Sequence, residues 1–369
     1  MANIHVHGKL PDPFLKPDGT RMTPEEWWQN RDAIRERVVK IEFGGMPPRP
    51  EVVEVEQLNE NALQYCYRVR AGSRERQLTF TLSVARSLGQ HIDGSVKYPV
   101  LLTGDGCYNN CESDTIDEAL RRGYVVARFN RLEIAYDRKE PRSGGIYDIY
   151  PDDKDFTAIS AWAWGYTAAI DALSHIPFAD VSEIGITGHS RGGKTVLLAA
   201  VMDERVKYVC PNNSGTHGCA PYRYAVTDLE TVAHDRPRSE VLEDMLKNFP
   251  HWMGKELSDY VGRLDELPYD MHFFGALIAP RCYFPIEGLQ DNWGNPNGSR
   301  QTYLAVKACY RYLGCEDRAA AWFRPGGHAH KYPAFEQFLL FMDRARRGLP
   351  PIAHHALDPF PGEELIFDF

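Results

Sequence analysis

Several features that would assign this chain to a specialised class are scarce or absent from its sequence. No apolar run reaches the ~18–20 residues that are needed to span a bilayer. The first residues, MANIHVHGKLPDPF, lack the basic segment followed by an apolar segment that is typical of a secretion signal. There is no excess of positive charge either, because the formal net charge is −9. We therefore expect a cytoplasmic protein whose main partner is neither nucleic acid nor a membrane.

Cysteine is present, but not in a pattern that is typical of a metal site. Cys107 and Cys111 lie four residues apart, and no second pair of Cys or His residues has zinc-like spacing. In a reducing compartment such cysteines remain free thiols. The sequence thus predicts no metal and no organic cofactor. It contains no repeat, low-complexity tract or linker, and it leaves the oligomeric state open.

The chain does contain a regular succession of strands and helices. EVVEVEQL, QYCYRVR and RQLTFTLSVA predict early antiparallel strands, and strands alternate with helices from YPVLLTG onward. The expected helices in this later part cover about 155–176, 190–202, 299–313 and 333–347. Such alternation indicates an α/β fold with a mainly parallel sheet and helices on both faces.

We expect a single domain over residues 1–369. An irregular N-terminal arm over about 1–50 contains one helix, which Thr23-Pro24-Glu25-Glu26 starts with an N-cap and a proline at the first position. A polar stretch over about 218–270 reads as an insertion above the carboxyl ends of the strands. Ligands bind at that edge of such sheets.

The most informative stretch is GITGHSRGGK, residues 185–194. Ser190 falls between a predicted strand and a predicted helix, with Gly188 and Gly192 on either side. This is the context of a nucleophile elbow, in which a sharp turn exposes a serine at the top of a sheet. The alternative, a structural serine in a turn, does not explain why small residues flank it at both positions. Ser190 is therefore our candidate nucleophile.

A serine nucleophile needs a base and an acid, which follow it in the order acid then histidine in this type of fold. The glycine-rich FRPGGHAHKYP follows a predicted strand and offers His328 and His330, and spacing alone does not choose between them. The loop EGLQDNWGNP offers Asp291, with Glu287 in reserve. Asn213, at the end of an earlier strand, does not carry the charge that would stabilise an imidazolium.

Two basic residues in the first turn of the predicted helix also suggest a function, since they oppose the helix dipole there. The backbone N–H of Arg191 is expected to bind the oxyanion, and its guanidinium adds a charge-assisted hydrogen bond. Lys194 is expected to reach a substrate hydroxyl or carboxylate. The loop TGDGCYN is a source of a second oxyanion donor, but no residue in it stands out.

These motifs together resemble the glucuronoyl (4-O-methylglucuronoyl methyl) esterases and their bacterial relatives, a carbohydrate esterase family of the α/β-hydrolase superfamily. The similarity extends over most of the chain, from LPDPFLKPDGTRMTPEEWW through AISAWAWGYTAAIDAL and GITGHSRGGK to GGHAHKYP. The resemblance implies an α/β-hydrolase fold, with Ser190 as nucleophile, Arg191 at the oxyanion and Lys194 on the sugar. It implies that the catalytic histidine is the second of the pair, His330.

The chain also departs from the family pattern. Many members have a glutamate where Asn213 stands, whereas some bacterial members use an acid on the later loop, which favours Asp291. His189 and Lys331 replace two cysteines that form a disulfide in secreted fungal members. Trp293 stands for the sugar-contacting tryptophan of the family, shifted by one position. The sugar-binding Gln and Glu of the family have no clear counterpart in the insertion.

The sequence therefore predicts a serine esterase with Ser190, His330 and Asp291 as its triad. The expected substrate is a small carbohydrate ester, either a glucuronoyl ester or an acetylated sugar, cleaved through an acyl-enzyme. Two alternatives stay open: a general carboxylesterase or lactonase, and a non-catalytic protein that binds a ligand in the same cleft. The acyl and alcohol parts of the ester are not specified by these motifs.

Overall fold

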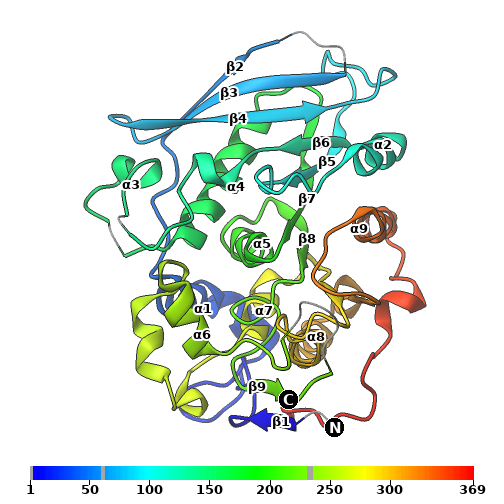
Figure 1. The fold of residues 1–369 in the computed structure, drawn as a ribbon. Coiled ribbons are helices and arrows are strands. Elements are labelled where there is room, and N and C mark those ends of the chain that lie inside the picture. Colours follow the sequence, from blue (N-terminus) through cyan, green and yellow to red (C-terminus); the bar gives the residue numbers. More distant parts are fainter. Residues whose placement is uncertain (1–2, 60–62, 141, 154, 231–235) are drawn as a thin grey trace.

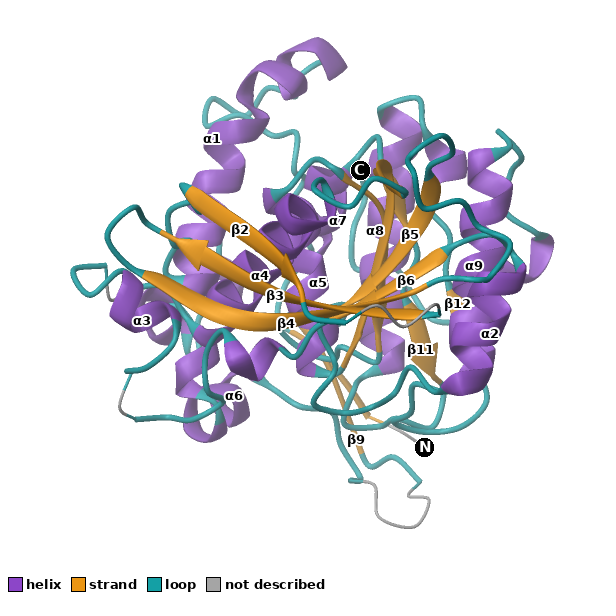
Figure 2. Cartoon of the chain, turned by 90° about the horizontal axis from the view of Figure 1, so that it is seen from above, coloured by secondary structure: helices purple, strands orange, loops and turns teal. Residues whose placement is uncertain are grey.

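A computed structural model describes residues 3–59, 63–140, 142–153, 155–230 and 236–369. Within these residues, one twisted sheet of ten strands runs through the molecule and carries helices on both faces (Figures 1 and 2). The strand order is β12-β11-β8-β7-β5-β6-β4-β3-β2, and β10 also pairs with β8. The strands β5, β6, β7, β8, β10, β11 and β12 pair parallel with one another. The remaining pairs of this sheet, β2 with β3, β3 with β4 and β4 with β6, are antiparallel. The predicted α/β class, with a mostly parallel sheet between two layers of helices, is confirmed.

The strands of this sheet match the apolar and alternating runs of the sequence. They are β2 (Val52–Gln57), β3 (Gln64–Gly72), β4 (Gln77–Ala85), β5 (Tyr98–Thr103), β6 (Val125–Arg128), β7 (Ala179–His189), β8 (Val206–Asn212), β10 (Cys282–Tyr283), β11 (Ile286–Gly288) and β12 (Trp322–Arg324). The larger helices are α1 (Pro24–Phe43), α2 (Ser113–Arg121), α4 (Ala158–Leu173), α5 (Arg191–Met202), α7 (His272–Ile278), α8 (Pro296–Tyr312) and α9 (Tyr332–Arg346). The shorter helices are α3 (Ile146–Ile149) and α6 (Leu242–Asn248).

The central strands are buried on both sides, which explains their continuous apolar sequences. Along β5, Val100 and Leu102 belong to the core that α4 and α5 cover, whereas Leu101 between them belongs to a second core. Phe338 of α9 and Ala119 of α2 line that second core. Because successive side chains of a strand point to opposite faces, one short run supplies both cores.

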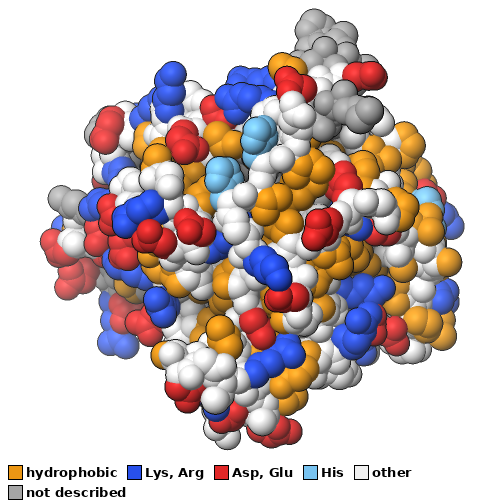
Figure 3. All heavy atoms as spheres, turned by 90° about the horizontal axis from the view of Figure 1, so that it is seen from below, with side chains coloured by type: hydrophobic (Ala, Val, Ile, Leu, Met, Phe, Trp, Pro, Cys, Tyr) orange, Lys and Arg blue, Asp and Glu red, His pale blue; other side chains and the backbone are white. Residues whose placement is uncertain are grey.

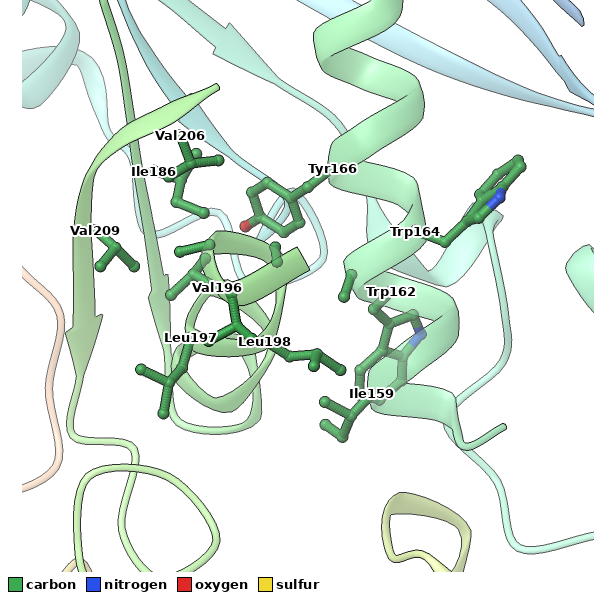
Figure 4. Packing of buried hydrophobic residues seen from close by; sticks show 14 of the residues in the cluster. Ile159, Trp162, Trp164, Tyr166, Ile186, Val196, Leu197, Leu198, Val206 and Val209 are labelled. Carbon is green, nitrogen blue, oxygen red and sulfur yellow. The ribbon is translucent and has the colours of Figure 1, made fainter. Parts of the chain in front are cut away.

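Helices α4 and α5 pack against each other on one face of the sheet, with α5 beside β7 and β8 (Figure 4). Figure 4 shows Trp162 and Tyr166 of α4 on the side of α5 that carries Val196 and Leu198. Two buried polar groups of α4 are paired here: the Trp162 indole N–H donates to the Ala135 carbonyl oxygen at 2.8 Å, and Tyr166 Oη accepts from the Gly104 amide at 2.6 Å. The apolar layer therefore holds the start of α5 in a fixed position.

Helix α1 begins where the sequence predicts. The Thr23 side chain accepts from the Glu26 amide, and the Glu26 carboxylate accepts from the Thr23 amide, so a complete capping box precedes the first turn. The arm also contains a strand that the sequence did not indicate, β1 (Asn3–Val6), which pairs antiparallel with β9 (Tyr224–Thr227). The arm therefore binds directly to the segment over 218–270. Residues 231–235 of that segment lie outside the described residues.

The eight cysteines are all free thiols. Of the helices in the described part of the chain, none is both long and apolar enough to cross a membrane. On the face seen in Figure 3, basic and acidic side chains are interspersed with hydrophobic ones.

Candidate active site

Ser190 lies on the turn between β7 and α5, as the motif predicts. Its backbone has φ 58° and ψ −120°, a conformation that residues other than glycine rarely adopt. The neighbours are small because the turn is tight. A Cβ on Gly188 would collide with the Gly192 carbonyl, and a Cβ on Gly192 would collide with the Asp105 carboxylate.

A buried ion pair supports this turn from below. The Asp105 carboxylate accepts from the His189 amide at 2.6 Å and pairs with the Arg131 guanidinium. Burial raises the pKa of Asp105, and the charge of Arg131 opposes that shift. The loop TGDGCYN, where a second oxyanion donor was expected, thus contributes a carboxylate that holds the elbow.

Ser190 opens into a cavity of about 310 Å³. The residues that line it come from the elbow, the end of β8, the insertion and the two loops after β11 and β12. They are Ser190, Arg191, Lys194, Asn213, Ser214, Gly215, Arg236, Glu240, Phe249, Trp252, Asp291, Trp293, Gly294 and His328. The structure thus brings most predicted site residues together, but His330 and Glu287 are not among those that line this cavity.

His328 is the histidine that pairs with the predicted acid. Its Nδ1 lies 2.7 Å from Asp291 Oδ2, and its side chain is 46% exposed, so the ring is accessible. An ionised carboxylate only accepts hydrogen bonds, so the proton lies on Nδ1. In the neutral imidazole, Nε2 is then the acceptor and is able to take a proton from a nucleophile.

The prediction that His330 is the histidine held by Asp291 is wrong. His330 is 3% exposed, its Nε2 lies 3.4 Å from Thr187 Oγ1, and its ring stacks on Phe335 at 4.0 Å. Burial lowers its pKa well below the usual value, so it is a neutral core residue. With only Ala329 between them, one histidine side chain lines the cavity and the other is buried in the core.

Asp291 is placed as an orienting acid. Its Oδ2 accepts from His328 and from Asn213 Nδ2, both at 2.7 Å, and its Oδ1 accepts from the Gly294 amide at 3.2 Å. Burial opposes ionisation, but the hydrogen bond and charge of His328 lower the pKa of Asp291 overall. An ionised Asp291 therefore holds one tautomer of His328.

Glu287, the reserve acid, is not arranged for this role. It is 1% exposed, and neither carboxylate oxygen has a hydrogen-bond partner among the described residues. Burial raises its pKa well above the usual value, with a further contribution from the charge of Asp291. Glu287 is therefore a neutral buried acid that does not contact either histidine.

Asn213 and Arg324 connect the acid to the histidine loop. While Asn213 Nδ2 donates to Asp291, its Oδ1 accepts from Arg324 Nη2 at 3.0 Å. The same Nη2 donates to the Gly327 carbonyl at 3.0 Å and to that of Ala329. One guanidinium thus fixes the loop that carries His328 to the amide that holds Asp291.

Lys194 is buried at the floor of the cavity, 3% exposed. Its Nζ donates to the Ser214 carbonyl at 2.6 Å and to the Thr216 carbonyl. An ammonium has three donors, so one remains for a ligand. Burial lowers the pKa of Lys194, and the charge of Glu240 opposes that shift.

Trp293 and Glu240 form the opposite wall. The Trp293 indole N–H donates to Glu240 Oε1 at 3.1 Å, and the Arg236 guanidinium lies 3.8 Å from the indole centroid. Burial raises the pKa of Glu240, and Lys194 opposes this shift. The cavity therefore combines an indole with a carboxylate and an ammonium, which suits a polyhydroxylated ligand.

Arg191 does not point freely to solvent. Its Nη1 pairs with Asp137, and its guanidinium carbon lies 4.8 Å from the Trp252 ring centroid. Sequence reasoning missed Asp137, Glu240, Trp252 and Arg324, because each joins the cavity through a fold contact between segments far apart in the chain. The position of Trp252 in the predicted insertion was the available signal for that residue.

In the part of the chain that the structure describes, no group of three or more His, Cys, Asp and Glu side chains is arranged to hold a metal ion. One acid–base pair, Asp291 with His328, faces the same cavity as Ser190. A serine together with a histidine that a carboxylate orients is the arrangement used in nucleophilic acyl transfer.

Comparisons with known proteins agree with this chemistry. The sequence profile of a family described as "Glucuronyl esterase, fungi" matches residues 69–314. The 4-O-methyl-glucuronoyl methylesterase 1 of Wolfiporia cocos is 27% identical over 91% of this chain and 82% of its own length. The enzyme of the same name from Phanerochaete chrysosporium is 30% identical over 87% of this chain and 65% of its own length. A solved structure of a carbohydrate esterase family 15 glucuronoyl esterase from Caldicellulosiruptor kristjansonii superposes with a TM-score of 0.81, at 27% identity and with 98% of each chain covered.

Proposed function

This chain belongs to the glucuronoyl esterase family, and from that premise we propose that it is a serine esterase that hydrolyses a glucuronoyl ester of a carbohydrate. The matched profile spans more than half of the chain and includes the elbow. The relatives named as glucuronoyl methylesterases cleave carboxylic esters of a uronic acid, which is the reaction that the cavity of this chain is equipped to perform.

In the proposed mechanism, Ser190 attacks the ester carbonyl while His328 Nε2 takes its proton. Asp291 keeps the proton on Nδ1 and stabilises the imidazolium that forms. The tetrahedral oxyanion is bound by the N-terminal amides of α5 and by the Arg191 guanidinium. His328 then protonates the leaving alcohol, and water releases the acyl group from Ser190 by the reverse steps.

The acyl part is the portion that the cavity recognises in this proposal. Lys194 and Glu240 supply a donor and an acceptor for ring hydroxyls, and Trp293 supplies an apolar face. The cavity volume of about 310 Å³ lies at the lower end of the ~300–1,000 Å³ usual for small-molecule sites, which suits one sugar unit better than a polymer segment.

The observation that carries the proposal is the Asp291–His328 pair, which opens into the same cavity as the strained Ser190. An oriented base and a serine on an elbow have no common structural purpose, since neither contributes to the core. An acetylated sugar is the competing substrate, because the same triad would cleave it.

The test is hydrolysis of benzyl glucuronate beside an acetylated sugar, with Ser190→Ala as the blank. We expect turnover of the glucuronate that is abolished in Ser190→Ala. Turnover of the acetyl ester alone would assign the same chemistry to another substrate. Turnover of either ester that persists in Ser190→Ala would refute the proposed nucleophile.

A further inference from the structure

Asp137 contacts three side chains, and two of them, Arg191 and Trp252, line the cavity. It follows the short helix η1 (Arg131–Glu133), in a loop that the sequence motifs do not include. Its Oδ2 pairs with Arg191, and its Oδ1 accepts from the Trp252 indole at 2.9 Å and lies 2.8 Å from His251 Nε2. One carboxylate therefore joins the first residue of α5 to the insertion.

This carboxylate is an anion in the folded protein. Its side chain is 15% exposed, and burial by itself would raise its pKa. The hydrogen bond from His251 and the charge of Arg191 outweigh burial and lower the pKa of Asp137 to about 2. Because an ionised carboxylate only accepts hydrogen bonds, His251 donates to it from Nε2.

The wall that Asp137 joins to Arg191 is itself rigid. The rings of Phe249 and Trp252 stack with centroids 4.0 Å apart and planes inclined by 2°. The Arg191 guanidinium lies over the Trp252 ring on one side and against Asp137 on another. Its side chain remains 32% exposed and lines the cavity, so part of the guanidinium still faces the site.

A free arginine would be a poor oxyanion donor, since it loses rotamer entropy when it is ordered. A donor that is already oriented needs no such reorganisation when the oxyanion forms. A carboxylate partner also weakens the field of the guanidinium, so its net benefit is positional. The contacts of Asp137 are those that orientation requires: a direct pair with the guanidinium, and hydrogen bonds to the ring on which the guanidinium lies.

We propose that Asp137 is a positioning residue for the oxyanion: it holds the Arg191 guanidinium at the cavity into which Ser190 opens and fixes the Phe249–Trp252 wall to it. This inference rests on the proposed function, in which Ser190 is the nucleophile and Arg191 binds the oxyanion. Asp137 thereby connects Arg191, which binds the oxyanion of the transition state, to Trp252 of the insertion.

The first test is Asp137→Asn, measured on benzyl glucuronate. The amide keeps an acceptor for Trp252 but removes the charge that holds Arg191. We expect kcat to fall about 10- to 100-fold, as for a donor displaced by a fraction of an ångström, with KM changed little. Trp252→Ala should show the opposite pattern and mainly raise KM, because it removes a wall of the cavity.

The decisive test is a double-mutant cycle with Arg191→Ala. If Asp137 acts through Arg191, Asp137→Asn has little further effect once Arg191 is gone. If Asp137→Asn lowers kcat by the same factor in both backgrounds, the carboxylate supports the fold generally, and the inference is overturned. Asp137→Glu, which keeps the charge but lengthens the side chain, runs through the same cycle if the asparagine variant does not fold.

The matched control is Asp155→Asn. Asp155 is a half-exposed carboxylate that pairs with Lys255 at 2.7 Å and Lys40 at 3.4 Å, and we expect its loss to leave kcat unchanged. Ser190→Ala separates the two hypotheses. Activity that persists in Ser190→Ala refutes the proposed function. If Ser190→Ala is inactive and the effects of Asp137→Asn and Arg191→Ala are additive, only the role of Asp137 is refuted.

Discussion

The nucleophile elbow and the histidine loop meet at one cavity, but they are held in different ways. The elbow between β7 and α5 is defined by neighbours in the chain: Gly188 and Gly192 permit the turn, and α5 starts at once after Ser190. The histidine loop over 325–331 has no such local definition. Its two histidines are fixed by residues from other segments, His328 by Asp291 and His330 by Thr187.

This difference shows what each part tolerates. At the elbow the backbone is strained and tightly packed, so even one added methyl group collides with neighbouring atoms. At the histidine loop, function depends instead on contacts with other segments: three hydrogen bonds converge on Asp291, and one of them comes from His328. Substitution of the accessible His328 should therefore reduce catalysis while the fold survives.

The largest expected effect separates the two histidines of the loop. His328→Ala should lower kcat by about 10⁴- to 10⁶-fold, because the serine loses its base. His330→Ala should retain most of kcat and instead lower the free energy of unfolding, since it empties a buried site against Phe335. Steady-state kinetics and urea unfolding on both variants make the comparison. A dead His330→Ala enzyme beside an active His328→Ala enzyme would reverse the assignment.

The next effect separates the two acids. Asp291→Asn should lower kcat by about 10³- to 10⁴-fold, because an amide does not hold His328 in the correct tautomer. Glu287→Gln is the matched variant, and kcat should be nearly unchanged, since the buried Glu287 is already neutral. The measurement is kcat for both variants on the same ester. A large loss of kcat in Glu287→Gln, with kcat retained in Asp291→Asn, would show that Glu287 and not Asp291 is the catalytic acid.

A smaller effect is expected at the amide that supports the acid. Asn213→Ala removes the donor at 2.7 Å from Asp291 and the acceptor of Arg324. Without these bonds Asp291 is expected to move slightly relative to His328. This should lower kcat by up to about 10²-fold, with thermal stability reduced only modestly. If kcat is unchanged, the bonds from His328 and the Gly294 amide are sufficient to hold Asp291.

The same contrast explains how far the sequence could predict the site. The central strands, the capped helix α1 and the elbow depend on local patterns, and these predictions are confirmed. The choice between His328 and His330 depends on which side chain meets Asp291, a residue more than thirty positions away on another loop. No periodicity in a glycine-rich loop specifies such a contact. Resemblance to the family favoured the second histidine, and the geometry selects the first.

Long-range contacts also explain the residues that were missed. Asp137 and Arg324 are ordinary charged residues in the sequence, and their partners, Arg191 and Asn213, lie 54 and 111 positions away. The pairing of β1 with β9 is similar, since it joins the arm to the insertion across more than two hundred residues. Such contacts become visible only once the sheet has placed the segments side by side.

The smallest effect tests the elbow itself, through His189. Burial, followed by the charge of His328, lowers the pKa of His189 to about 4, and its Nδ1 lies 2.8 Å from Asn212 Oδ1. Below a pH of about 6.5 the unfolded chain gains a proton at this residue and the folded chain does not, so stability falls with pH until about pH 4. At about pH 5 this histidine should cost roughly 2 kcal/mol of the free energy of unfolding.

His189→Asn keeps a polar side chain at the elbow but removes the titration. Urea unfolding at about pH 7.5 and about pH 5 should therefore show a smaller loss of stability on acidification in the variant than in the wild type. Replacement of the exposed His91 by asparagine is the matched control, because it removes a histidine without emptying a buried site. If His189→Asn loses as much stability on acidification as the wild type, the elbow is open enough to solvate a charged ring. The contrast between a closed elbow and an accessible histidine loop would then not hold in solution.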